Sequence, residues 1–169
     1  MSGTWRSLGT RRGLRNLATT AVAALASAGL GAAATTPDAR WYGELEKPPW
    51  DPPGIAYPLV WTPLYVDIAV TTAAAITALE EQGLPARAKE LRTALAINLV
   101  LNTGWSVLFW RVRRPWLSAV WCGLLTTQSL ELVRLLREVD PSLHHALAPY
   151  PAWCAFATAL NADIARRNF

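Results

Sequence analysis

Five stretches of predominantly apolar residues follow one another along the chain, separated by short polar segments. A stretch of about 20 such residues is long enough for an α-helix to cross the hydrocarbon core of a bilayer. The five stretches are Asn16–Ala34, Ile55–Leu79, Ala94–Trp110, Pro115–Leu136 and Ala146–Ala165. The pattern therefore predicts an all-α membrane protein, built as a bundle of five transmembrane helices.

The segments between these stretches are short, and no internal repeat or flexible linker marks a second domain. The predicted connections are Trp41–Pro53, Glu80–Arg92, Arg111–Arg114 and Arg137–His145. We expect a basic N-terminal extension at residues 1–15, followed by a single five-helix domain at residues 16–169.

Two interpretations of the first apolar stretch stay open. Arg6, Arg11, Arg12 and Arg15 precede an Ala-rich run that ends in small residues, which is also the pattern of a cleavable secretory signal. We favour a retained helix, because the other four helices would otherwise lose one wall of the bundle.

The segment between the first two stretches is rich in aromatic residues and in proline. Proline fixes its own φ and restricts the residue before it, so Lys47–Pro53 is not expected to form a helix or a central strand. Such a segment can hold Trp41, Tyr42 and Trp50 in a nearly fixed arrangement at the membrane surface. We interpret this aromatic, Pro-rich loop as the cover of something flat and apolar.

Polar and aromatic residues share one face of the third predicted helix. Asn98, Asn102, Trp105 and Phe109 follow helical spacing, so their side chains point to the same side. An unpaired amide in hydrocarbon is costly, and both asparagines should therefore turn inward. They could join helices by hydrogen bonds, meet the polar edge of a ligand, or do both.

Aromatic stripes also run along the second and fifth predicted helices. The stripe members are Tyr57, Trp61 and Tyr65 in the second helix, and Tyr150, Trp153, Ala157 and Asn161 in the fifth. Core packing or an interfacial belt explains each stripe when it is taken alone. Three stripes that converge beneath one aromatic loop favour a pocket.

Composition agrees with a membrane protein and argues against several other classes. Hydrophobic residues make up 52% of the chain and charged residues 17%, whereas soluble domains carry about 25% charge. The net charge is only +4, and the basic residues flank the apolar stretches instead of forming a stripe of the kind that binds nucleic acid.

Cys122 and Cys154 lie inside apolar stretches and are expected to be buried thiols. His144 and His145 lack further ligands at metal spacing, so no metal site is expected.

Several motifs occur in a fixed order between Thr35 and Arg167. They are Trp41-Tyr42, Leu45-x-Lys47-Pro48-x-Trp50-x-Pro52-Pro53, Trp61-x-x-Leu64-Tyr65, Asn102-x-x-Trp105 and Pro149-Tyr150-x-x-Trp153-x-x-Phe156-Ala157-Thr158-x-Leu160-Asn161. Together they resemble the TspO/MBR family, which contains the bacterial tryptophan-rich sensory proteins and the mitochondrial translocator protein, also called the peripheral-type benzodiazepine receptor.

The resemblance implies a five-helix membrane bundle, usually a homodimer in bacteria, with a pocket beneath the first loop. That pocket would accept tetrapyrroles such as protoporphyrin, and also sterols and benzodiazepine-type aromatic ligands; a porphyrin would be a ligand and not a cofactor. By position, the implied loop cover is Trp41, Tyr42 and Trp50, and the implied ligand-binding residues are Tyr57, Trp61, Asn102, Trp105, Trp116, Tyr150, Trp153 and Ala157.

Two departures from the family pattern matter. Many members have proline two residues after the third-helix tryptophan, whereas this chain has Val107, so we expect no proline-induced kink there. The sterol motif of the animal proteins requires a tyrosine near the C-terminus, and Leu160–Arg167 contains none. Sterol recognition through that motif is therefore not expected.

Three functions are compatible with these patterns. The resemblance favours a tetrapyrrole-binding protein that acts as a sensor, regulator or carrier. An alternative is a light- and oxygen-dependent porphyrin-degrading enzyme, in which Trp61 and Trp153 would donate electrons. A third is a passive structural role in the membrane. The two cysteines are compatible with a protein made in the reducing cytoplasm, and no clear cleaved signal is present. Both observations favour a bacterial inner membrane over an outer one.

Overall fold

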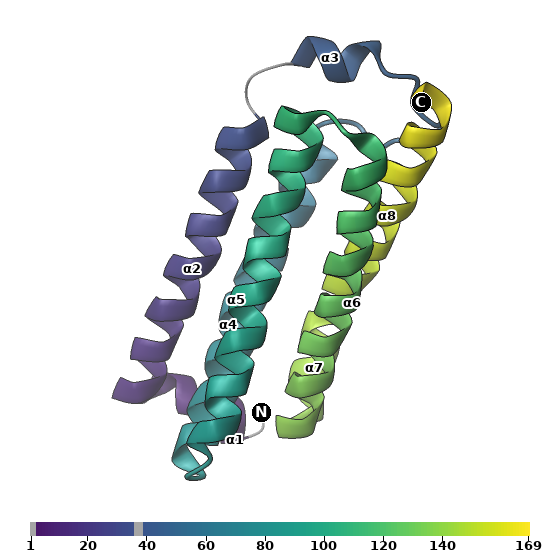
Figure 1. Ribbon diagram of the computed structural model, residues 1–169. Coiled ribbons are helices and arrows are strands. Elements are labelled where there is room, and N and C mark those ends of the chain that lie inside the picture. The colour runs from purple at the N-terminus through teal and green to yellow at the C-terminus, as the bar shows by residue number, and fades with distance from the viewer. Residues whose placement is uncertain (1–2, 36–38) are drawn as a thin grey trace.

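The computed structural model describes residues 3–35 and 39–169, and in these ranges the regular structure is helical (Figure 1). Short elements are α1 (Gly3–Arg6), η1 (Ser7–Gly9), α3 (Ala39–Glu44) and α7 (Pro141–Leu147). The long helices are α2 (Arg11–Thr35), α4 (Ala56–Glu81), α5 (Pro85–Ser106), α6 (Pro115–Val139) and α8 (Pro149–Asn168), and a π-helical segment η2 (Val107–Val112) continues α5.

The long helices run side by side, and short elements cover both ends of the bundle. α6 packs against α8, α2 packs against α4 and α5, and α5 also packs against α6. Figure 1 shows α3 lying across one end of the bundle near the C-terminus, whereas α1, α7 and the turn between α4 and α5 lie at the opposite end. We call these the α3 end and the α1 end.

Several helix boundaries predicted from apolar stretches were wrong. α5 begins at Pro85 instead of Ala94, so the connection from α4 is only Gln82–Leu84, with Gly83 at φ 71°. The predicted connection at Arg137–His145 is instead largely helical, because α6 continues to Val139 and α7 follows. Apolar length marks the part of a helix that avoids water, whereas proline in the first turn marks where α5, α6, α7 and α8 start.

Three of the long segments are long and apolar enough to cross a membrane. They are Arg11–Thr35, Ala56–Glu81 and Pro85–Val112. The faces of α2 are arranged as membrane solvation requires, since its buried positions are small or polar and the large side chains exposed beyond the arginines of its first turns are apolar. The buried positions are Gly13, Asn16, Thr20, Ala24, Ser27, Gly31 and Ala34, and the exposed large apolar ones are Leu14, Val22, Leu25 and Leu30.

Hydrogen bonds from the inner face hold α2 to its neighbours. Asn16 Nδ2 donates to Thr77 Oγ1 at 3.0 Å, and Thr20 Oγ1 donates to the Ala69 carbonyl at 2.8 Å. Ser27 Oγ donates to the Leu99 carbonyl at 3.2 Å. α2 therefore forms a wall of the bundle through polar contacts to both α4 and α5.

The helical pattern of α5 widens at Val107 although proline is absent there. The π-helical segment η2 begins at this residue, and Arg113, just beyond it, has a left-handed φ of 55°. The local irregularity that we did not expect without proline is thus present in another form. Such π segments change which way the following side chains point, and here they bring Phe109 and Trp110 toward α3.

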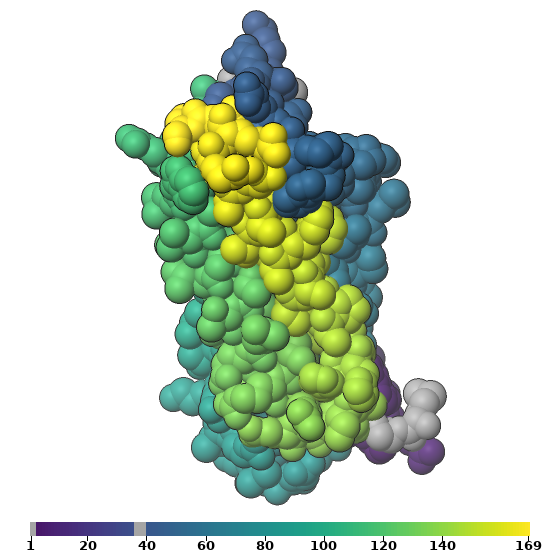
Figure 2. Space-filling model, turned by 90° about the vertical axis from the view of Figure 1, so that its right-hand side faces the viewer, coloured from purple at the N-terminus to yellow at the C-terminus, as the bar shows by residue number. Residues whose placement is uncertain are grey.

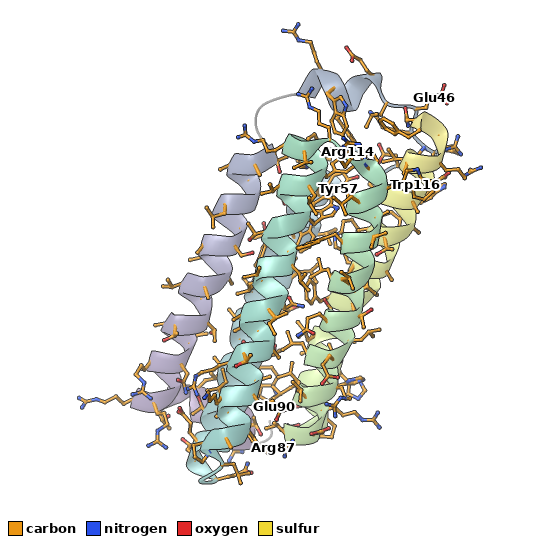
Figure 3. The ribbon with its side chains drawn as sticks, viewed as in Figure 1. Glu46, Tyr57, Arg87, Glu90, Arg114 and Trp116 are labelled. Atoms are coloured by element: carbon orange, nitrogen blue, oxygen red, sulfur yellow. The ribbon has the colours of Figure 1, made fainter. Side chains whose placement is uncertain are left out.

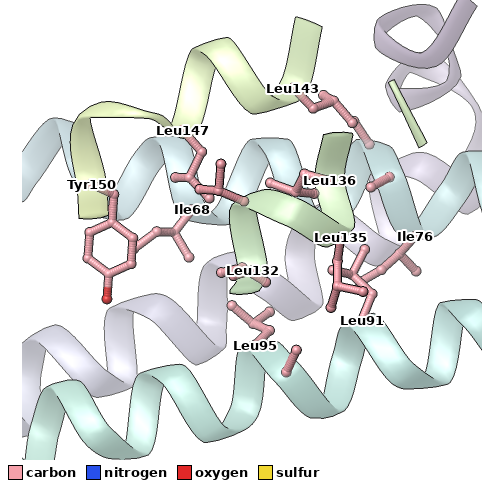
Figure 4. Close-up of a cluster of buried hydrophobic side chains, with 14 of the residues drawn as sticks. Ile68, Ile76, Leu91, Leu95, Leu132, Leu135, Leu136, Leu143, Leu147 and Tyr150 are labelled. Atoms are coloured by element: carbon pink, nitrogen blue, oxygen red, sulfur yellow. The ribbon is translucent and has the colours of Figure 1, made fainter. Parts of the chain in front are cut away.

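The half of the bundle near the α1 end is filled by aliphatic side chains. Figure 4 shows leucines of α5, α6 and α7 meeting Ile68 and Ile76 of α4, with Tyr150 at one side of the cluster. This packed half fixes the spacing of the helices. The aromatic residues gather in the other half, and there the bundle is hollow.

Gly104 allows α5 and α6 to approach closely beside this hollow half. A Cβ at this position would lie 2.8 Å from a ring carbon of Trp121, whose Nε1 donates to the Leu101 carbonyl at 2.8 Å. We expect Gly104→Ala to lower the free energy of unfolding by about 1–3 kcal/mol through overpacking, measured by denaturant titration in detergent. Gly123→Ala is the matched control, because its Cβ would meet only Thr158 Cγ2 at 3.8 Å. A Gly104→Ala protein as stable as the control would contradict this packing.

Candidate functional site

A cavity of about 500 Å³ occupies the half of the bundle beneath α3. Residues of α2, α3, α4, α5, η2, α6 and α8 contribute to its wall. The aromatic residues of the wall are Tyr42, Tyr57, Trp61, Tyr65, Trp105, Phe109, Trp110, Trp153 and Phe156. Ligand pockets of roughly 300–1,000 Å³ with mostly apolar walls are typical for organic molecules, and this cavity has that size and character.

Seven of the eleven ligand-binding residues predicted from the sequence line the cavity. They are Tyr42, Tyr57, Trp61, Asn102, Trp105, Trp153 and Ala157. They come from four different parts of the chain, and the three stripes read from the sequence do converge on one space. Residues Trp41–Pro53, which lie above the cavity, form what we call the covering segment. Figure 3 shows Tyr57 in the upper part of the bundle, on the same side as this segment.

The other four predicted residues lie outside the cavity wall. Trp116 is 51% exposed in the first turn of α6, and Trp50 is 42% exposed and contacts Phe156 edge-on. Trp41 packs against Phe109 with ring centroids 5.4 Å apart. Tyr150 is fully buried in the aliphatic cluster below the cavity.

The segment above the cavity is held by hydrogen bonds to one carboxylate. The hydroxyls of Tyr42 and Tyr57 both donate to Asp51 Oδ1, at 3.0 Å and 3.2 Å. Burial, assisted by Tyr57 and by the Asp51 charge, raises the pKa of Tyr42, so this hydroxyl keeps its proton. The Lys47 ammonium lies 4.3 Å from the centre of the Tyr42 ring. The Tyr57 bond thus joins the covering segment to α4, whereas the Tyr42 bond lies within the segment.

A second attachment of the covering segment comes from the end of α8. The Glu46 backbone N–H donates to Asn168 Oδ1 at 2.8 Å, and Asn168 Nδ2 donates to the Glu46 carbonyl at 2.9 Å. Figure 2 shows the covering segment, in dark blue, lying directly against the yellow end of α8. Sequence reasoning missed both Asp51 and Asn168. Asp51 lies inside the aromatic motif, where it could have been noticed, but no local pattern points to Asn168.

A buried polar network forms the floor of the cavity. The Tyr150 hydroxyl donates to Asn98 Oδ1 at 2.7 Å and accepts from Asn102 Nδ2 at 3.3 Å. The Tyr65 hydroxyl donates to Asn102 Oδ1 at 2.9 Å, and Asn98 Nδ2 donates to Ser129 Oγ at 3.1 Å. The prediction that both asparagines turn inward is confirmed. Asn98 joins helices, whereas Asn102 joins helices and also reaches the cavity wall.

The indoles of the wall differ in their hydrogen bonding. Trp105 Nε1 donates to Asn161 Oδ1 at 3.1 Å, whereas Trp153 Nε1 is buried and has no partner. The Trp153 ring stacks on Phe156 with centroids 5.2 Å apart. The wall therefore offers flat aromatic surfaces together with polar groups, among them the Tyr65 hydroxyl and the Asn102 amide.

Both cysteines are buried and unpaired, as the sequence predicted, and both line the cavity. Cys122 Sγ lies 3.7 Å from the Cys154 carbonyl, so the two residues face each other across the contact of α6 and α8. In the described part of the chain, no three His, Cys, Asp or Glu side chains gather closely enough to hold a metal ion.

Comparison with known proteins gives a consistent result. The model of the TspO/MBR family matches residues 18–167. The chain is 30% identical to the uncharacterized membrane protein YtaB of Bacillus subtilis, over 78% of this chain and 82% of the relative. It is 30% identical to the tryptophan-rich protein TspO of Chlorobaculum tepidum, over 82% and 86% of the two chains. It is 33% identical to the translocator protein of Ovis aries, over 72% and 71%. The matched family is the one that the sequence motifs resemble.

The network at the cavity floor gives a stability prediction. Tyr150→Phe removes the hydroxyl that connects Asn98 with Asn102 and leaves buried amide atoms without partners, which costs about 1–3 kcal/mol. We expect the free energy of unfolding in detergent to fall by this amount. Tyr65→Phe, the matched control, removes a single hydrogen bond at the cavity wall and should cost less. If the two variants lose the same stability, the two hydrogen bonds of the Tyr150 hydroxyl contribute no more than the single bond of Tyr65, which would contradict this role of the network.

Proposed function

This chain belongs to the TspO/MBR family, and we propose that it is a five-span membrane protein that binds a tetrapyrrole, such as protoporphyrin, in the cavity beneath α3. Binding would let it act as a sensor, a regulator or a carrier of haem-pathway intermediates. The observation that carries this proposal is the aromatic cavity of about 500 Å³, to which all five long helices contribute.

The proposal of five spans extends the three segments that qualify by length and apolar composition to α6 and α8. The exposed large side chains of α6 include Trp116, Leu117, Val120, Leu124 and Leu130. The outer face of α8 carries Ala152, Ala155 and Ala159. Such faces suit lipid, and the charged residues of both helices lie in the C-terminal part of each, from Glu131 onward in α6 and from Asp163 onward in α8.

The chemistry of the wall suits a flat ligand with polar edges. Trp61, Trp105 and Trp153 come from three helices, and a planar ring system can stack on indoles with ring centroids about 4.5–7 Å apart. The Asn102 amide and the Tyr65 hydroxyl could meet the ligand's polar atoms deep in the cavity. At the α3 end, Lys47 and Arg40 could attract its carboxylates. The homodimer and the bacterial inner membrane location that we predicted from the sequence stay predictions.

A second candidate is photo-oxidative degradation of the porphyrin. Trp61 and Trp153 both belong to the cavity wall, which is what electron donation to an excited porphyrin at contact distance requires. Substitution of both by Phe distinguishes the two functions, because a binding protein would keep most of its affinity in the dark. A photoenzyme would in addition lose product formation in the light.

The proposed binding is tested by titrating protoporphyrin IX into the protein in lipid nanodiscs, in the dark, while tryptophan fluorescence is measured. We expect saturable quenching, and we expect Trp61→Ala to weaken the affinity about tenfold through the loss of one stacking surface. Trp116→Ala is the matched control, because this indole lies outside the cavity.

The two variants give the titration a clear negative outcome. If Trp61→Ala and Trp116→Ala change the affinity equally, the ligand does not occupy the cavity. If quenching rises linearly in every protein, the porphyrin only dissolves in the lipid. Either result would overturn the proposed function.

A further inference from the structure

Arginines gather around one carboxylate at the α1 end, far from the aromatic cavity. The Arg92 guanidinium contacts Glu80 Oε1 at 2.6 Å, and those of Arg12 and Arg15 both approach Glu80 Oε2 to 3.9 Å. Three positive charges therefore surround one negative charge. Figure 3 shows side chains with nitrogen tips projecting outward where α2 begins.

The Glu80 carboxylate leaves most of these arginine donors unused. Asn16 Nδ2 also donates to Glu80 Oε2, at 3.0 Å, so this oxygen already has a closer partner than either Arg12 or Arg15. At 3.9 Å the guanidiniums feel the charge of Glu80 without forming hydrogen bonds to it. The side chain of Arg15 is 70% exposed and that of Arg12 is 49% exposed. Their donors can therefore bind an anion from outside.

The position of this cluster corresponds to the headgroup region of a bilayer. Arg12 and Arg15 lie in the first turns of α2, Glu80 lies at the end of α4, and Arg92 follows the start of α5. The spans Arg11–Thr35 and Ala56–Glu81 both end here. Arginine binds phosphate oxygens through paired N–H donors and is favoured where phosphate is recognised.

The same helix offers an apolar surface next to the arginines. Arg11, Leu14, Val22 and Leu25 follow helical spacing along the outer face of α2, and the three apolar side chains are strongly exposed. A molecule with a charged head and an apolar tail would thus find both of its parts matched along one helix. A free inorganic phosphate would use only the arginines and would leave the apolar side chains uncovered.

The start of α2 is fixed in place and does not behave as a loose tail. The Gly13 N–H donates to Thr10 Oγ1 at 3.0 Å, which caps the helix, and a Cβ at Gly13 would lie 2.2 Å from the Ser7 carbonyl oxygen. The segment before it is anchored by Trp5, whose Nε1 donates to Ser142 Oγ at 2.8 Å. The arginines are therefore presented by a folded structure.

We propose that Arg11, Arg12 and Arg15, with Arg92, bind the phosphate headgroup of an anionic phospholipid, whose acyl chains lie along Leu14, Val22 and Leu25. This site is separate from the aromatic cavity and does not depend on the function proposed for it. The bound lipid would hold the α1 end in the leaflet that is richer in anionic lipid.

The proposal is tested by titrating phosphatidylglycerol into the full chain in detergent and counting bound lipids by native mass spectrometry. We expect specific binding to the parent protein that exceeds the binding of phosphatidylcholine. Arg11→Gln, Arg12→Gln and Arg15→Gln together should weaken phosphatidylglycerol binding on the order of 100-fold, given the usual contribution of a basic residue at an anionic membrane surface. If the triple variant does not fold, Arg15→Gln alone should weaken binding about fivefold.

The matched control removes three charges at the same end of the bundle, in Arg87→Gln, Arg134→Gln and Arg137→Gln. Arg87 and Arg134 are paired with Glu138, and Arg134 also with Glu131 at 2.6 Å. Arg87 lies on α5 and Arg134 and Arg137 lie on α6, so none of the three belongs to the proposed surface of α2, and their loss should change lipid binding little. Equal weakening in both triple variants would mean only non-specific charge attraction and would overturn the site. Displacement of the lipid by inorganic phosphate, beyond that by sodium chloride at the same ionic strength, would instead identify a site for free phosphate and overturn the lipid assignment.

Discussion

The hydrogen bonds of the Tyr150 hydroxyl are the interaction on which the rest of the bundle depends. This hydroxyl connects two amides of α5 with the start of α8, and through Asn102 it reaches Tyr65 of α4. Buried amides without partners would be costly in an apolar interior, so the network fixes how α4, α5 and α8 meet at the level of the cavity floor. It also lies at the boundary between two different halves. On one side aliphatic side chains fill the space, and on the other the aromatic cavity begins.

The two halves have complementary roles. Close packing of leucines near the α1 end sets the helix spacing without any help from a ligand. In the hollow half, large rings meet small residues, and the covering segment is attached by Asp51 to Tyr57 and by Glu46 to Asn168. These hydrogen bonds and the ring contacts of Trp41, Tyr42 and Trp50 lie at the surface end of the bundle. A ligand could therefore enter or leave by local movement of the cover while the packed half stays intact.

Helical spacing and the cost of unpaired amides were enough to predict the inward asparagines and the convergence of three aromatic stripes. Helix ends were predicted poorly, because apolar stretches report contact with lipid while Pro85 and Pro141 mark where helices start. Trp116 was assigned to the ligand site from its motif position, and Tyr150 also from its stripe on the fifth helix; Trp116 is 51% exposed and Tyr150 lies fully buried below the cavity. The clamp by Asn168 joins residues 122 positions apart, and no local pattern in the sequence contains that information.

The central claim, that the cavity itself holds the ligand, can be tested without any substitution. Cys122 and Cys154 both line the cavity, so their modification by N-ethylmaleimide reports whether the space is occupied. The measurement is the rate of modification of each cysteine, followed by mass spectrometry in nanodiscs, with and without saturating protoporphyrin IX in the dark. Our account predicts that the porphyrin slows the modification of both cysteines severalfold. Unchanged rates at saturating porphyrin would mean that the ligand binds elsewhere and would contradict the account.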